Sequence, residues 1–283
     1  MSAEITMEMR SLLHPLFKVL EDGISEFTFA NIYLFRDTHG YRISRIKDGP
    51  IVITGKDGGG TFFMLPFGLP DAQALGALFN DFDFFKNAPV AQARSLVEAG
   101  YTVAEDPPNF DYIYMREELA SLDGRRFHKK KNMVNAFLGR YLCSGRPLTD
   151  DLLGDAKEVL ALWRKENAAN GDYRQAGEAL EKARELQLCG GIYYVADTPV
   201  AYLLGEELRE DTFVIHFEKG ALGYKGLLQF VNQNFATMLP EKYRFINREQ
   251  DLGDEGLRHS KMSYRPSGFI KKYRATRGVT GTP

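Results

Sequence analysis

The stretch HFEKGALGYKGLLQFVNQNF, residues 216–235, joins an apolar strand pattern to an amphipathic helix through a corner rich in glycine. The helix is expected over residues 224–238, because its apolar side chains recur at helical spacing. Gly220, Gly223 and Gly226 lack a Cβ atom, so the backbone at this corner can approach a ligand closely. Free N–H groups and the helix dipole favour an anion at such a helix start. A plain strand-to-helix corner is the alternative interpretation.

A second informative stretch, RFINREQDLGDEGLRHSKMSYRP, covers residues 244–266. Phe245 and Ile246 begin an apolar strand that runs directly into polar residues, followed by a glycine and a short basic helix. Polar groups at the carboxyl end of a strand are a common way for α/β proteins to build a ligand site. A charged connector whose side chains pair in solvent is the alternative. The residues expected to position an acceptor are Asn247, Arg248, Glu249, Asp251, Arg258 and Lys261.

The order of elements around these two stretches predicts a notch in a sheet. Residues 192–217 read as a meander of three strands, which the helix and then the polar-ended strand follow. The strand before the helix can then splay from the strand after it and expose backbone groups to an extended cofactor. The candidate cofactor contacts are Lys219, Gly220, Gly223, Tyr224, Lys225 and Gly226.

Each half of the chain has the same order of expected elements: helices, a meander, a helix and a strand. In the first half, residues 33–66 hold the strand-like runs and residues 70–82 the helix. Gly, Pro and Ser cluster in Cys143–Pro147, which is the expected joint. We therefore predict an α/β (α+β) chain with two domains, residues 1–145 and 146–283. Each would have a mixed, mostly antiparallel sheet flanked by helices.

The basic residues are sorted along the chain, although the net charge is only −2. A linker helix expected over residues 125–141 has one apolar stripe for docking and a basic opposite face. Residues 256–283 contain seven Lys or Arg and no acidic residue. Sorted cations suggest a polyanionic or phosphorylated partner, whereas a solvated helix face and a basic tail would be the simpler explanation. The candidate polyanion-binding residues are Arg125, Arg126, Lys129, Lys130 and Lys131.

Composition excludes several classes of protein. With 283 residues and 44% hydrophobic residues, the chain can bury two cores. No apolar run approaches the roughly 18 residues that span a bilayer, and the start lacks the order of a signal peptide, so a cytoplasmic location is expected. Cys143 and Cys189 have no metal or disulfide context and are expected as buried reduced thiols. The five histidines have no ligand spacing, so no metal is expected.

The strings FHKKKN, FEK…YKG…QFVNQNFA and INREQDLGDEGLRHSKMSYRP resemble bacterial proteins related to the C-terminal domain of phosphatidylglycerol lysyltransferase. The resemblance covers most of the chain, is strongest over residues 190–274 and includes residues 110–141. It implies two tandem acyl-CoA N-acyltransferase-like (GNAT) domains. Many members of this group have no established reaction, so the resemblance specifies the fold better than the substrate.

The resemblance also implies acyl or aminoacyl transfer to an amine or hydroxyl on a lipid head group, a peptide or a small molecule. The donor would be a coenzyme A thioester or aminoacyl-tRNA. The usual pyrophosphate loop of acetyltransferases is Gln or Arg, two residues, Gly, one residue, then Gly or Ala. Here Gly223 is followed two residues later by Lys225, a departure from that pattern that argues against ordinary coenzyme A binding. A charged loop also suits a larger polyanion such as tRNA.

Such a transfer needs a base, N–H groups for the oxyanion and an acid for the leaving group. Glu218 and His216 are expected to alternate to the same face of a strand end, so both are candidates for the base. A solvent-facing pair on a sheet edge is the alternative. Tyr264 follows the short basic helix, where acetyltransferases often have a tyrosine acid, but an aromatic residue covering the core would give the same pattern.

Two classes of function remain open at this level. As an enzyme, the chain would use Arg248, Glu249 and Asp251 to orient an acceptor. As a non-catalytic binding protein for RNA or an anionic phospholipid head group, it would use the basic helix and tail. Product formation that depends on a donor supports the first class, and salt-sensitive binding without turnover supports the second.

Overall fold

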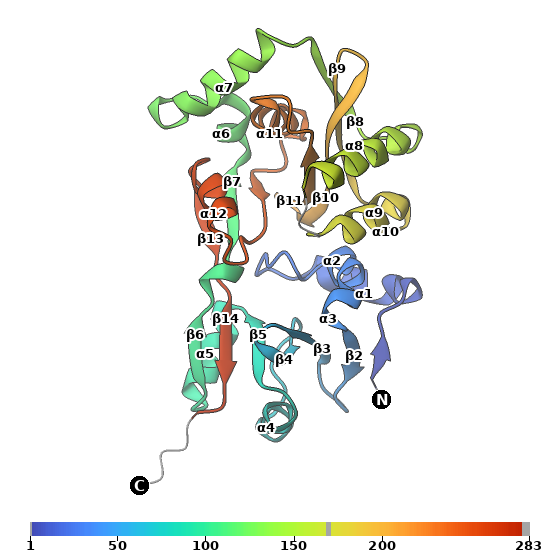
Figure 1. Cartoon of the computed structure of the whole chain (residues 1–283). Helices are drawn as coiled ribbons and strands as arrows, with labels where there is room; N and C mark the ends of the chain where they lie inside the picture. Colours follow the sequence, from blue (N-terminus) through green and yellow to red (C-terminus); the bar gives the residue numbers. More distant parts are fainter. Residues whose placement is uncertain (1, 168–170, 279–283) are drawn as a thin grey trace. The chain divides into compact units, whose positions relative to one another are not determined.

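The computed structural model describes residues 2–167 and 171–278 (Figure 1). The chain forms two compact units, and their boundaries differ from the expected break after residue 145. Within the described ranges, no helix is both long and apolar enough to cross a membrane. The first unit comprises residues 1–111, 250–255 and 269–283, and the second comprises residues 112–249 and 256–268.

The boundaries differ because each sheet takes up a strand from a distant part of the sequence. β7 (Asp111–Met115) pairs with β12 (Phe245–Asn247) in the sheet of the second unit. β14 (Tyr273–Thr276), near the carboxyl end, lies between β5 (Phe84–Ala88) and β6 (Thr102–Glu105) in the sheet of the first unit. No single cut in the chain can therefore separate the two units.

The first unit is built on a seven-stranded sheet with the order β1-β2-β3-β4-β5-β14-β6. Its core includes Phe63, whose ring contacts those of Phe79 on α4 and Phe85 on β5. The side chain of Asp71 caps α4 by accepting from the N–H of Ala74 at 2.8 Å. The remaining elements are β1 (Ala3–Glu4), β2 (Arg42–Arg45), β3 (Ile51–Asp57), β4 (Gly60–Met64), η1 (Met7–Met9), α1 (Arg10–Lys18), α2 (Phe29–Leu34), α3 (Arg36–His39), α4 (Ala72–Asp81), α5 (Val90–Glu98) and η2 (Pro107–Asn109).

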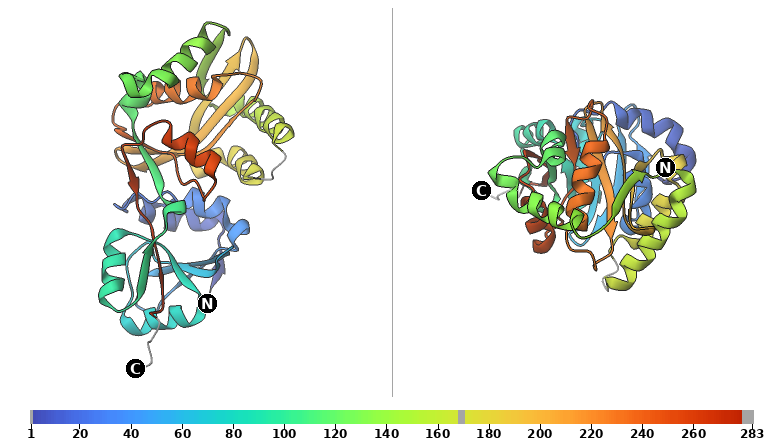
Figure 2. Two further views of the ribbon diagram at one scale, coloured as in Figure 1. Left: turned by 60° about the vertical axis from the view of Figure 1, so that its left-hand side comes forward. Right: turned by 90° about the horizontal axis from the view of Figure 1, so that it is seen from above.

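The second unit has a seven-stranded sheet with the order β13-β7-β12-β11-β10-β9-β8. The expected joint at Cys143–Pro147 is β8, because these residues pair with β9 along their whole length. α7 and α11 pack together on one face of β9 to β11, and α8 packs on the other (Figure 2). The elements are β9 (Cys189–Val195), β10 (Thr198–Arg209), β11 (Thr212–Gly220), β13 (Gly268–Ile270), α6 (Arg116–Ser121), η3 (Arg125–Phe127), α7 (His128–Leu138), η4 (Asp150–Leu152), α8 (Leu153–Glu166), α9 (Tyr173–Glu181), α10 (Ala183–Leu186), α11 (Leu227–Met238) and α12 (Glu255–Met262).

The expected splayed strands are β11 and β12. They pair in parallel over only three residues, ending at Val214 opposite Asn247, while β11 continues to Gly220. In the first unit β4 and β5 also form a short parallel pair, which ends at Phe63 opposite Phe85. The two mixed, mostly antiparallel sheets with their helices confirm the predicted α/β (α+β) class.

The glycine corner between β11 and α11 is shaped by packing against α7. Gly226 has φ +95°, and a Cβ atom there would lie 2.6 Å from the carbonyl oxygen of Met133. The Phe137 and Phe230 rings, 5.4 Å apart, close the contact between the two helices. α11 therefore begins at Leu227, three residues later than the sequence pattern predicts. A glycine at position 226 is needed for this contact whether or not a ligand binds here.

Candidate active site

The Glu218 carboxylate connects two elements that the splay separates. Glu218 lies on β11 beyond the last residue that pairs with β12. One oxygen accepts from the side-chain amide of Asn232 on α11 at 2.7 Å, and the other accepts from Nη2 of Arg248 at 2.8 Å. Arg248 directly follows β12, so the expected polar strand end does reach the splayed strand. Both members of this ion pair are largely buried.

Arg248 retains a hydrogen-bond donor that the protein does not use. Its Nη1 atom is buried, and no residue in the described part of the chain accepts from it. Its guanidinium lies 5.0 Å from the ring centre of Tyr264 and 5.7 Å from that of Tyr114. Because a buried N–H without a partner costs free energy, such a group in a charged cluster indicates a place for a ligand acceptor atom.

Lys130 on α7 joins the same cluster. Its ammonium lies 3.9 Å from the ring centre of Tyr264, and the side chain is half-buried. Burial, and next the positive charge of Arg248, lower the pKa of Lys130 to about 8, although the charge of Glu218 opposes this. At neutral pH a fraction of this lysine is therefore an uncharged amine that can accept a proton. We call Glu218, Asn232, Arg248, Lys130 and Tyr264 the Glu218 cluster.

Tyr264 is almost fully buried at the centre of the Glu218 cluster. Burial raises its pKa to about 12, even though the nearby Arg248 charge lowers it. The hydroxyl is therefore protonated at neutral pH and able to donate. Tyr264 also packs with the main core of the second unit, as the alternative interpretation of this residue predicts. Its role as an acid stays a prediction.

His216 does not join Glu218, because a β-bulge separates them. Leu204 pairs with Phe217 and Gly205 with Ile215, which leaves His216 as the additional residue on β11. The expected alternation to one face is therefore wrong. His216 is buried between Glu206, at 3.1 Å, and Glu249, at 2.7 Å.

The charges around His216 reverse the effect of its burial. Burial alone would lower its pKa, but the hydrogen bonds and negative charges of Glu206 and Glu249 outweigh this and raise the pKa to about 10. The imidazole is therefore charged at neutral pH and cannot accept a proton. This arrangement does not suit a general base.

The other expected acceptor residues take different places. The Asn247 side-chain oxygen accepts from the N–H of Glu249 at 2.8 Å. The Lys261 ammonium is buried and donates to the backbone carbonyl oxygens of residues 248 and 249. Asp251 belongs to the first unit, where its carboxylate accepts from the N–H of Gly253. Arg258 is exposed on α12. Of the six residues, only Arg248 lies in the Glu218 cluster.

The residues expected to contact a cofactor at the glycine corner do not all lie on the same side of the sheet. Lys219 points to the face of the sheet that α8 covers, opposite α11. There its ammonium contacts Asp172 at 2.5 Å and lies 4.2 Å from the ring centre of Trp163 on α8. A Cβ atom at Gly220 would crowd Leu228, and one at Gly223 would meet nothing. The Tyr224 ring contacts that of Tyr141 edge-on, and Lys225 is exposed.

The basic segment before and within α7 has three kinds of environment. Arg126 pairs with Glu118, and Lys131 pairs with Asp123 at 2.6 Å. Lys130 points into the Glu218 cluster, so the expected uniform basic face does not form. The other two members, Arg125 and Lys129, are exposed.

Sequence reasoning missed Asn232 and the inward position of Lys130. Lys130 precedes Val134 by four residues and Phe137 by seven, which places it on the buried stripe of α7. That spacing could have identified it. Across residues 2–167 and 171–278, no group of three or more His, Cys, Asp or Glu side chains could hold a metal ion. Cys143 is only partly buried and Cys189 is exposed, so the expectation that both thiols are buried is wrong.

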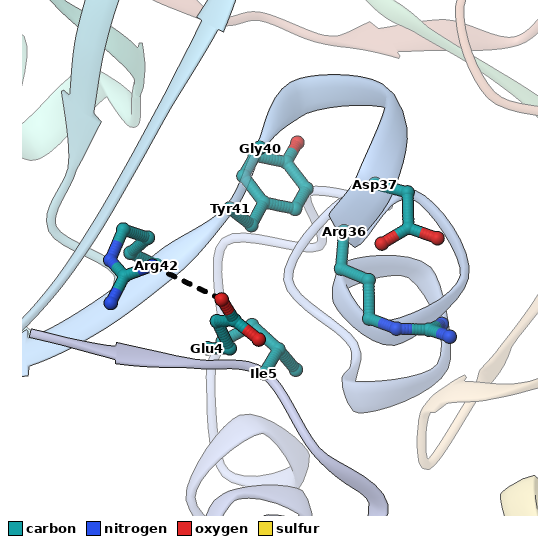
Figure 3. A pocket seen from close by; sticks show the side chains of 7 residues that line it. All are labelled: Glu4, Ile5, Arg36, Asp37, Gly40, Tyr41 and Arg42. Carbon is teal, nitrogen blue, oxygen red and sulfur yellow. Dashed lines mark hydrogen bonds and ion pairs between the residues drawn. The ribbon is translucent and has the colours of Figure 1, made fainter.

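A hollow of about 300 Å³ lies in the first unit (Figure 3). Glu4 and Arg42 form an ion pair of 3.5 Å along its edge, and Tyr41 closes one side. None of the site residues expected from the sequence lines it. Its lining residues are Glu4, Ile5, Arg36, Asp37, Gly40, Tyr41 and Arg42.

Comparisons with known proteins agree with this architecture. A conserved protein of unknown function from Bacteroides thetaiotaomicron VPI-5482 has 30% sequence identity and a TM-score of 0.85, covering 98% of this chain and 99% of that one. The structure of L-PGS from Bacillus licheniformis has 15% identity and a TM-score of 0.60, covering 89% of this chain and 92% of that one, which shows similarity of fold.

A curated relative, an uncharacterized protein from Mycoplasmoides gallisepticum, is 20% identical over 171 residues. The match covers 58% of this chain and 54% of that protein, so the chain spans about half the length of this relative. Residues 17–276 match the family model described as "Phosphatidylglycerol lysyltransferase, C-terminal". The chain therefore belongs to this family. Its two units, each built on a mixed sheet flanked by helices, agree with the expected fold class.

Proposed function

We propose that this member of the phosphatidylglycerol lysyltransferase C-terminal family transfers an aminoacyl or acyl group from an activated ester to a hydroxyl or amine. The reaction would take place at the Glu218 cluster of the second unit. The family name supports an aminoacyl ester as donor and a lipid head group as acceptor. A coenzyme A thioester as donor, and a peptide or small molecule as acceptor, belong to the same chemical class.

The observation that carries this proposal is the unused donor of Arg248. Its Nη1 is buried and unpaired among the described residues, while its Nη2 is held by Glu218. A fixed donor in a site with little water stabilises an oxyanion much better than a mobile one in solvent, because it needs no reorganisation. In this proposal, Nη1 of Arg248 donates a hydrogen bond to the carbonyl oxygen of the donor ester.

Lys130 and Tyr264 supply the proton transfers. The uncharged amine of Lys130 takes the proton of the acceptor hydroxyl or amine, whose oxygen or nitrogen then bonds to the ester carbonyl carbon. The negative charge collects on the carbonyl oxygen next to Arg248. When the tetrahedral intermediate collapses, the bond to the ribose oxygen or thioester sulfur breaks, and Tyr264 protonates that leaving atom. Lys130 then returns its proton to Tyr264.

The donor would enter along the splay between β11 and β12. Exposed Lys225 at the glycine corner and exposed Arg125 just before α7 supply positive charge for the phosphates of tRNA or coenzyme A. Glu166 accepts from the N–H of Leu222 at 2.9 Å and so already occupies one of the amides of the corner. This carboxylate disfavours a tightly held pyrophosphate there and favours the longer, more distributed polyanion, tRNA.

The test is a transfer assay on the purified chain with radiolabelled lysyl-tRNA, other aminoacyl-tRNAs and acyl-coenzyme A, each with phosphatidylglycerol vesicles or a peptide acceptor. The rate should rise with pH to a plateau, with a midpoint close to the pKa of Lys130, about 8. Lys130→Met should lower the rate by about 10²-fold or more, in the range typical of a general base. Its control is Lys129→Met, an exposed neighbour on the same helix.

Two results would contradict the proposal. One is a Lys130→Met variant that transfers as fast as Lys129→Met. The other is salt-sensitive binding of tRNA or anionic vesicles without product from any donor, which would instead support a non-catalytic binding protein.

A further inference from the structure

The backbone around Arg248 is held in a strained conformation. Glu249, the next residue, has φ +56°, in the left-handed region that side chains other than glycine rarely adopt. Such a conformation costs about 1 kcal/mol or more and persists only where the surrounding contacts enforce it. In this turn the strained residue is adjacent to the one that carries the unused donor.

Several contacts enforce the turn from different elements. The N–H of Arg248 donates to the backbone carbonyl of Tyr112 on β7 at 3.0 Å. The N–H of Tyr112 donates in turn to the backbone carbonyl of Glu249 at 3.2 Å. Asn247 accepts from the N–H of Glu249, and His216 binds the Glu249 carboxylate. The turn is therefore anchored to β7 and β11, the two strands that flank β12 in the sheet.

Lys261 is the contact that acts on both residues of the turn. Its ammonium donates to the carbonyl of Arg248 at 2.7 Å and to that of Glu249 at 3.1 Å. The side chain is only 7% exposed, so its desolvation is costly unless these bonds repay it. The backbone carbonyl of Lys261 in turn accepts from the Tyr114 hydroxyl at 2.9 Å. Lys261 thus fixes the backbone of Arg248 relative to an aromatic ring beside the guanidinium.

We propose that Lys261 is a positioning residue, which holds the strained turn at residues 248–249 so that the Arg248 guanidinium stays in the Glu218 cluster. The role of Arg248 in transfer rests on the proposed function, whereas its position beside Lys130 does not. The two ideas can therefore fail separately.

The first unit contains a matched turn that serves as a control. Lys86 directly follows Phe85, the last residue of β5 that pairs with β4, and Asn87 after it has φ +57°. Lys86 is nearly buried and pairs with Asp57 at 2.5 Å. Lys86→Met therefore removes a buried lysine at the corresponding position of the other sheet without touching the Glu218 cluster.

The experiment measures the ionisation of Lys130 and the kinetics of transfer in the full chain. Competitive labelling of amines with trace acetic anhydride across pH, read by mass spectrometry, gives the ionisation of Lys130 without any substrate. The charge of Arg248 contributes to the lowered pKa of Lys130, so its displacement in Lys261→Met should raise that pKa. Transfer should fall by about 10- to 100-fold, mainly in kcat, as expected for a misplaced catalytic group.

Two further variants complete the test. Lys86→Met should leave both the ionisation of Lys130 and kcat unchanged, even if it lowers the melting temperature. Glu249→Gly removes the carboxylate held by His216 but adopts the left-handed conformation without strain, so it should fold even if Lys261→Met does not. Because the turn loses one anchor, the pKa of Lys130 should rise in this variant too, by less than in Lys261→Met.

Wild-type ionisation of Lys130 in Lys261→Met and in Glu249→Gly would overturn the positioning role. So would an equal loss of kcat in Lys86→Met. If the wild-type chain transfers nothing, the labelling result alone decides the positioning role, and only the proposed function fails.

Discussion

The two units use the same backbone device for different ends. In each, a short parallel pair of strands stops, a cation follows the last paired residue, and a residue with left-handed φ comes next. Lys86 and Asn87 hold these positions in the first unit, and Arg248 and Glu249 hold them in the second. The cation pairs with one carboxylate in both units.

The difference lies in what is left after that pairing. The Lys86 ammonium packs over the Phe62 ring and donates to the Asp57 carboxylate. This cation therefore has a partner within its own unit. Arg248 pairs with Glu218 through one arm of its guanidinium, and the other arm has no partner among the residues that the structure describes. The comparison teaches that a repeated fold does not repeat a site, since the chemistry depends on one planar, two-armed side chain.

The largest expected effect concerns the first unit, where Lys272 is fully buried and contacts Glu26 and Asp111. Lys272→Met leaves two buried carboxylates together and should lower the free energy of unfolding by about 3–5 kcal/mol, as for other broken buried ion pairs. Urea denaturation would measure this free energy of unfolding, and hydrogen exchange in β5 and β14 would report on the first unit. Its neighbour Lys271, exposed and paired with Glu105, is the control, and Lys271→Met should change stability much less. Equal effects would contradict the stabilising role of the buried Lys272 ion pairs.

A reciprocal exchange of the two cations sharpens the comparison next. Arg248→Lys keeps a charge for Glu218 but removes the second arm, so transfer should fall by about 10²-fold, as when one oxyanion donor is lost. The melting temperature should change little, because the ion pair can re-form. Lys86→Arg in the first unit should leave transfer unchanged. A transfer assay on both variants tests this, and an unimpaired Arg248→Lys would show that the spare donor has no role.

His216 and His39 are expected to change the stability of the protein in opposite directions as the pH rises. The pKa of His216 is raised from about 6.5 to about 10, so its stabilising contribution is complete below pH 6.5 and is lost as pH rises from 6.5 to 10. Burial lowers the pKa of His39 in the first unit, so its contribution is lost as pH falls below 6.5. Denaturation from pH 5 to 10 should show that His216→Gln flattens the alkaline side and His39→Gln the acidic side. The same pH profile in both variants would contradict the assigned charges.

The smallest expected effect is at the glycine corner. Lys225 is exposed, so Lys225→Glu should weaken tRNA or coenzyme A binding only a few-fold at low salt and hardly at all at high salt. Titration at two salt concentrations measures this. Affinity that is equal to wild type at low salt would remove the corner from the donor path.

Local patterns in the sequence were enough for the elements and for part of the site. The order of the elements predicted the splay, and the polar strand ends placed Glu218 and Arg248 beside it. These features depend on residues close together in the chain, so a reader of the sequence can find them. The family resemblance added the family itself, which the match over residues 17–276 confirms.

Pairing between distant strands decided the rest. The bulge that turns His216 away from Glu218 lies opposite Gly205, where a Cβ atom would lie 1.9 Å from the carbonyl oxygen of Val214. Neither the exchange of β7 and β14 between the sheets nor the approach of Lys130 to Tyr264 follows from local spacing. The sequence determined which side chains could do chemistry. Only the tertiary structure decided which of them meet, because burial and charge pairing are properties of neighbours in space.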